Sequence, residues 1–184
     1  CFGFPTDGIP VVLDMATSSI PYGKIALAAV EGDSIPDTWA LDADGNPTTD
    51  PAAVAGLHPV AGPKGSGLAM VIDIFCSLLA GMPWGPHINK MYGEMDAPRH
   101  LGNFVMAVDT KRFMPLHIFK QNLDEMLREF TALDPAAGFD RVYYPGEIEG
   151  LRREQRRTEG IPVEAGLADE LAELGQRYHV SSPV

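Results

Sequence analysis

A glycine-rich stretch around a single lysine has the residue types that a bound phosphate or carboxylate group needs. Residues 61–67 read AGPKGSG, and an apolar run follows directly. A turn of this kind at the start of a helix exposes backbone amide hydrogens, and Lys64 adds positive charge beside them. Two interpretations stay open from the residues alone: the stretch binds an anion, or it only starts a helix.

Two phosphate motifs do not fit this stretch. A P-loop requires serine or threonine after its lysine, because that hydroxyl binds magnesium, whereas Gly65 follows Lys64. The dinucleotide fingerprint G-x-G-x-x-G starts at Gly65 but meets Met70 where its last glycine belongs. The sequence therefore does not predict a Rossmann fold.

A strand-end carboxylate and a loop arginine are further candidates for binding. Asp14 lies at the end of a predicted strand, where it can bind a ribose hydroxyl or cap a helix. Tyr92 and Arg99 lie in a loop, 82–103, that is rich in proline and glycine. An arginine there can bind a substrate carboxylate through its planar fork, or be an ordinary surface residue.

The histidines and cysteines do not show the spacing of a metal site. The five histidines are His58, His87, His100, His117 and His179. None has a second ligand at the short spacing that zinc sites use, and the chain has only two cysteines. The sequence thus predicts neither a protein-made metal site nor a disulfide framework.

Both helices and strands are expected to position these residues. Strands are predicted over residues 9–15, 104–109 and 140–147. Helices are predicted over residues 22–30, 68–82, 116–133, 151–160 and 167–178. The 116–133 segment has apolar residues on one face and charged residues opposite, whereas the 68–82 run is apolar enough for a core helix.

Composition limits the class of protein. The chain has 184 residues, 45% of them hydrophobic, so it can bury the core of one domain, or of one domain and a small lobe. Its formal charge of −11 opposes binding to nucleic acid and to anionic membranes. The apolar run is too short to span a bilayer, no signal segment is visible, and the cysteine usage fits a reducing cytoplasm.

Five stretches together resemble one enzyme family. They are VVLDMATS (11–18), GDSIPDTWALDADGNPTTDP (32–51), AGPKGSGLAMVID (61–73), MYGEMDAPRHLGNF (91–104) and FDRVYYPGE (139–147). In this order they resemble the C-terminal half of the malate/L-lactate dehydrogenase family, which is unrelated to the better-known lactate dehydrogenases. Residues 1–184 are therefore expected to form that half, including most of the NAD-binding part, as a fragment or subunit of a larger domain.

The resemblance implies a fold and a set of cofactor contacts. The fold is a mixed-sheet α/β arrangement that binds NAD, or possibly NADP, without a Rossmann fold, usually in a homodimer. The positions that match cofactor contacts are Asp14, Met15, Ala16, Lys64, Gly146, Glu147 and Ile148. Glu147 departs from the glutamine expected in the nearest members of the family, and Tyr92 and Arg99 become candidate substrate contacts.

The resemblance also implies a reaction. The family oxidises 2-hydroxy acids, and several of the stretches resemble the branch that converts ureidoglycolate to oxalurate in allantoin degradation. Its histidine base and main arginine come from the N-terminal half, and the motifs Ser-His-Gly and Gly-His-Ser-Gly are absent from this sequence. We therefore expect no catalytic residue in this chain, no activity of the chain alone, and an N-terminal half or partner chain that completes the site.

Two alternatives place the chain in other classes. Cys1 is the first residue, and in N-terminal-nucleophile hydrolases a terminal cysteine attacks while its own α-amine acts as base. In the other alternative, the chain is a non-catalytic subunit that keeps only the family fold.

Overall fold

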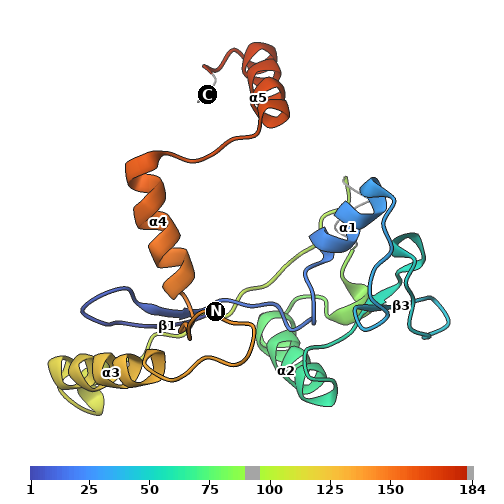
Figure 1. Cartoon of the computed structure of the whole chain (residues 1–184). Helices are drawn as coiled ribbons and strands as arrows, with labels where there is room; N and C mark the ends of the chain where they lie inside the picture. Colours follow the sequence, from blue (N-terminus) through green and yellow to red (C-terminus); the bar gives the residue numbers. More distant parts are fainter. Residues whose placement is uncertain (90–95, 182–184) are drawn as a thin grey trace. The chain divides into compact units, whose positions relative to one another are not determined.

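The computed structural model describes residues 1–89 and 96–181. The chain divides into two units (Figure 1). Unit 1 combines residues 1–14 with the chain from Thr110 onward, and unit 2 is the continuous segment Met15–Asp109. Unit 2 is therefore an insertion between the two segments of unit 1.

Unit 1 begins with a short hairpin. Strands β1 (Phe2–Phe4) and β2 (Val11–Leu13) pair antiparallel, with Phe2 opposite Leu13 and Phe4 opposite Val11. The Thr6 hydroxyl donates to the carbonyl oxygen of Ile9 at 2.9 Å, which closes the connecting loop. The strand predicted over 9–15 is thus confirmed in its central residues, and Asp14 directly follows it.

The helices of unit 1 follow the local sequence pattern closely. They are η4 (Thr110–Arg112), α3 (Leu116–Thr131), α4 (Glu147–Glu159) and α5 (Ala165–Tyr178). The apolar face of α3 packs toward the hairpin and lines a cavity of about 500 Å³ with Phe4, Val11 and Tyr144. The predicted helices over 116–133, 151–160 and 167–178 are confirmed, with α4 starting earlier than expected.

Unit 2 contains a small apolar core and a second two-stranded sheet. Its elements are α1 (Tyr22–Glu31), β3 (Ala40–Leu41), η1 (Pro51–Ala53), β4 (Gly56–Leu57), α2 (Pro63–Asp73), η2 (Ile74–Leu78) and η3 (Gly85–His87). Strands β3 and β4 pair antiparallel. Ile25 of α1 is buried with Ile35 and Ala40, which confirms the predicted helix over 22–30 and gives it its core contacts.

Two predicted strands do not form. Residues 104–109 have no regular structure, and residues 140–147 run into a turn and the start of α4. A strand needs a neighbour for its backbone hydrogen bonds, and in the described residues the segment 104–109 has none, with Val105 90% exposed. Apolar β-branched composition indicated a strand there, but composition alone supplies no partner.

The predicted core helix forms but is not covered. Helix α2 continues into η2, a π-helical turn in which the Leu79 N–H donates to the Ile74 carbonyl oxygen at 2.9 Å. Most of its large apolar side chains are exposed: Leu68, Met70, Val71, Ile72, Ile74, Phe75 and Leu78. Over the described ranges, no helix combines the length and the apolar character needed to cross a bilayer.

Candidate cofactor site

A tight turn places the third predicted cofactor segment. Residues 144–147 form a type II turn, in which the Tyr144 carbonyl oxygen accepts from the Glu147 N–H at 3.1 Å. Pro145 occupies the second position, and Gly146 occupies the third with φ +89° and ψ −9°. The turn leads directly into α4, so Gly146, Glu147 and Ile148 lie at the positive end of that helix.

This turn packs against β2. The Val12 N–H donates to the Pro145 carbonyl oxygen at 2.9 Å. A Cβ atom on Gly146 would lie 2.9 Å from the Val12 nitrogen and 3.2 Å from the Pro10 carbonyl oxygen. Glycine is required here both by its positive φ and by the lack of space. The structure thereby brings the residues 146–148 beside the strand that leads into Asp14.

Glu147 is directed into the turn. It is only 8% exposed, its Oε1 accepts from Arg141 Nη2 at 2.5 Å, and its Oε2 accepts from the Tyr144 N–H at 3.3 Å. The Arg141 guanidinium also lies 4.4 Å from the centre of the Tyr143 ring. The family resemblance pointed to Glu147 but not to Arg141. The available signal was an arginine and a glutamate on either side of a Pro-Gly turn.

Tyr144 links the turn to the hairpin loop. Its hydroxyl donates to the Ile9 carbonyl oxygen at 3.2 Å. Burial raises the pKa of this phenol above its ordinary value of 10.0, and the negative charges of Glu147 and Asp124 raise it further, against the opposing effect of Arg141. The phenol therefore stays a hydrogen-bond donor at neutral pH.

Lys64 lies in the first turn of α2, in unit 2. Gly62 precedes the helix with φ +62°, Pro63 is the first helical residue, and Lys64 is exposed. Gly65 is buried, and a Cβ atom there would collide with the Val60 carbonyl oxygen. The glycine-rich stretch therefore does start a helix, and it leaves the Lys64 ammonium accessible beside the positive helix end.

Met15 and Ala16 begin unit 2, and both are exposed. The next residue, Thr17, accepts at its carbonyl oxygen from the Val60 N–H at 2.9 Å. The Ser19 N–H donates to the His58 carbonyl oxygen at 2.8 Å. The chain that follows Ala16 thus lies beside the segment that leads into Lys64.

The remaining candidates are Tyr92, Arg99 and Cys1. Tyr92 lies outside the described residues, and Arg99 is partly buried in an irregular segment. Cys1 carries an exposed free thiol. In the portions of the chain that are described, no group of three or more histidine, cysteine or acidic side chains could hold a metal ion.

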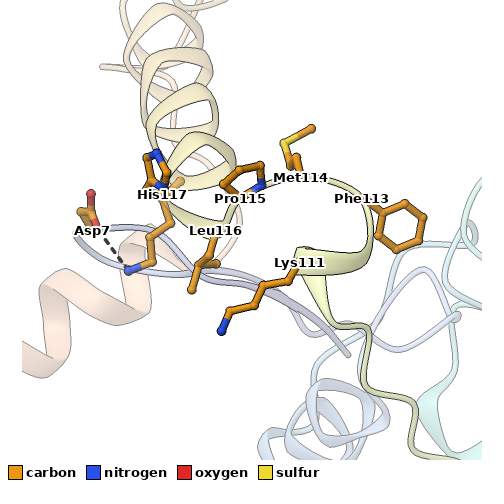
Figure 2. Close-up of a pocket in the computed structure, with 8 residues that line it drawn as sticks. Asp7, Lys111, Phe113, Met114, Pro115, Leu116 and His117 are labelled. Atoms are coloured by element: carbon orange, nitrogen blue, oxygen red, sulfur yellow. Dashed lines mark hydrogen bonds and ion pairs between the residues drawn. The ribbon is translucent and has the colours of Figure 1, made fainter.

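A second cavity of unit 1 contains none of the predicted residues. It has a volume of about 820 Å³ and lies at the start of α3, where Figure 2 shows Lys111, His117 and Asp7 around it. Lys120 forms an ion pair with Asp7, with 3.0 Å between Nζ and Oδ1. The basic character of this cavity is therefore partly balanced by a side chain of its own lining.

Comparison with known proteins places the chain among dehydrogenases. Residues 1–172 match the malate/L-lactate dehydrogenase family, and the chain belongs to that family. It is 42% identical to ureidoglycolate dehydrogenase (NAD(+)) of Escherichia coli O157:H7 over 163 residues, which make up 88% of this chain and 47% of that protein. The chain spans about half the length of the curated relatives it matches.

Solved structures confirm the fold. Malate dehydrogenase from Entamoeba histolytica superposes with a TM-score of 0.84 and 29% identity, covering 99% of this chain and 55% of that one. Sulfolactate dehydrogenase from Methanocaldococcus jannaschii superposes with a TM-score of 0.78 and 34% identity, covering 97% of this chain and 52% of that one. The α/β fold expected from the family resemblance is therefore correct.

Proposed function

We propose that this chain supplies much of the NAD site of a dehydrogenase that oxidises a 2-hydroxy acid. The proposed substrate is ureidoglycolate, with oxalurate as product. The observation that carries the proposal is the 42% identity, over 88% of this chain, to a protein named ureidoglycolate dehydrogenase (NAD(+)). Malate and sulfolactate are the competing substrates, because dehydrogenases named for them are also similar.

The described residues fit the polar parts of NAD. Asp14 offers an exposed carboxylate that can accept hydrogen bonds from ribose hydroxyls. Lys64 offers an exposed ammonium beside the positive end of α2, which suits a diphosphate. Met15, Ala16, Gly146, Glu147 and Ile148 complete the proposed contacts. When bound, NAD accepts the hydride that leaves C2 of the substrate.

The substrate side of the site is proposed to depend on another segment of protein. Oxidation of a 2-hydroxy acid needs a base for the hydroxyl proton and a cation for the carboxylate. We assign the base to a histidine of the N-terminal half, with Arg99 and Tyr92 as further substrate contacts. The proposed assembly contains that half and is a homodimer in the cytoplasm.

An assay of substrate preference tests this function. The assembled protein is offered ureidoglycolate, malate, lactate and sulfolactate in turn, with NAD or NADP, and reduced nicotinamide is followed at 340 nm, its absorbance band. We expect the highest kcat/KM for ureidoglycolate with NAD. A higher kcat/KM for another acid would reassign the substrate, and no nicotinamide reduction with any of the acids would overturn the function.

The assignment of Lys64 has its own test. Lys64→Ala removes the ammonium at the start of α2 and is expected to raise the Kd for NAD about tenfold, as titration calorimetry would measure. Lys24→Ala is the matched control, because Lys24 is also exposed on a helix of unit 2. Equal Kd values for the two variants would remove Lys64 from the site.

A further inference from the structure

We infer that Arg141 is a positioning residue for the cofactor, because its ion pair with Glu147 fixes the backbone of residues 146–148. The inference rests on the proposed NAD site. Arg141 itself is no proposed cofactor contact. It acts on a segment whose shape is set by the turn 144–147.

The Glu147 carboxylate depends on partners within the protein. The Glu147 side chain is only 11% exposed, so its carboxylate has little access to water and must be balanced within the protein. In the described part of the chain its partners are the Arg141 guanidinium and the Tyr144 N–H. Without Arg141, the carboxylate would keep one neutral donor, and it would gain hydration only by turning outward.

An outward turn of the Glu147 side chain would disturb residues 146–148, the proposed cofactor segment. Glu147 is both the last residue of the turn and the first residue of α4. Its carboxylate holds the Tyr144 N–H, and its own N–H donates to the Tyr144 carbonyl oxygen, so the two bonds close the turn from both sides. A Glu147 side chain that turns outward therefore releases one side of the turn and shifts Gly146 and Ile148.

An arginine suits position 141 better than a lysine. The guanidinium stacks on the Tyr143 ring while one of its nitrogens binds Glu147. This contact limits the freedom of the guanidinium, so less side-chain freedom is lost in making the ion pair. A lysine carries the charge but cannot stack in the same way, so Arg141→Lys should restore the function only in part.

The test compares four forms of the assembled protein: unmodified, Arg141→Met, Arg141→Lys, and the control Arg128→Met. Arg128 is exposed on α3 in the same unit. For Arg141→Met we expect the Kd and KM for NAD to rise about tenfold, with kcat at saturating NAD changed by less than about twofold. Arg141→Lys should fall between Arg141→Met and the unmodified protein, and Arg128→Met should match the unmodified protein.

Hydrogen exchange without NAD gives a second measurement. The amides of residues 144 and 146–148 should exchange faster in Arg141→Met than in Arg128→Met, because one side of the turn is open. Unchanged exchange, or unchanged Kd for NAD in a folded Arg141→Met protein, would overturn the inference. If Arg141→Met does not fold, Arg141→Lys decides by the same criteria. If the unmodified protein does not bind NAD, that result contradicts the proposed function. The exchange measurement needs no NAD, so it tests the effect of Arg141 on the turn in either case.

Discussion

Val12 and Pro145 are joined by a backbone hydrogen bond of 2.9 Å, although all of unit 2 lies between them in the sequence. This bond holds the turn before α4 against the strand that leads into Asp14. Asp14 and residues 146–148, which are proposed to contact the cofactor, are therefore connected through the backbone of unit 1. Side chains around the turn add further contacts to this backbone bond, and substitutions can measure how much each contact stabilises the protein.

Gly146→Ala should destabilise the protein by about 2 to 4 kcal/mol, because alanine at positive φ is strained and its Cβ would crowd the Val12 nitrogen. Gly138→Ala is the matched control, since Gly138 has the same φ of +89° but no atom near its Cβ position. Denaturant unfolding measures both variants, and only Gly146→Ala should also weaken NAD binding. Equal losses of stability would show that the contact with β2 contributes nothing.

Glu147→Gln should be milder than Arg141→Met in its effect on the free energy of unfolding. A glutamine keeps an acceptor for the Tyr144 N–H and carries no charge, whereas removal of Arg141 leaves the largely buried Glu147 carboxylate with only the Tyr144 N–H as its partner. We expect a loss of less than about 1 kcal/mol for Glu147→Gln and about 1 to 2 kcal/mol for Arg141→Met, because the Arg141 side chain is 43% exposed and solvent screens the ion pair in part. Glu149→Gln, at an exposed position of α4, is the control, and the reverse order of the two main variants would contradict this explanation.

Tyr144 should make the free energy of unfolding depend on pH in the alkaline range. Because its folded-state pKa is raised, the phenol contributes stability that is fully present below pH 10.0 and is lost as the pH rises through the raised value. Tyr144→Phe removes the bond to Ile9, at a cost of about 1 kcal/mol at pH 8, and also removes this titration. Urea unfolding from pH 8 to 11 should show a steeper fall for the unmodified protein; parallel curves would exclude the phenol as the cause.

Two glycines of α2 should respond to alanine in opposite directions. Gly67→Ala is expected to stabilise the protein by about 0.5 to 1 kcal/mol, because the position is helical and open. Gly65→Ala should destabilise it, because the new methyl group collides with the Val60 carbonyl oxygen. Thermal unfolding of the two variants measures the difference, and a stabilising Gly65→Ala would show that the segment before α2 shifts at little cost.

The helices were predictable because their information is local. Phe119, Leu123 and Phe130 recur at helical spacing, and α3 forms with that face toward the hairpin. The strand expected at 104–109 shows the opposite case, since its composition was suitable but no neighbouring strand accompanies it. Pairing depends on distant residues, so a local pattern could not decide it.

The candidate site was predictable only in part, for the same reason. The residues around Lys64 indicated a helix start correctly, because glycine and proline act on their own backbone. The burial of Glu147 and its ion pair with Arg141 depend on how the turn packs against Val12. That packing joins residues far apart in the sequence, and no spacing rule describes it.

The division of the chain also determines an order of events during synthesis. Unit 2 is one continuous segment, whereas the two segments of unit 1 precede and follow it. Val12 is made before unit 2, whereas its partner Pro145 is made only after all of unit 2. The hydrogen bond between β2 and the turn can therefore form only after all of unit 2 has been synthesised, and forming it closes a long loop of the chain.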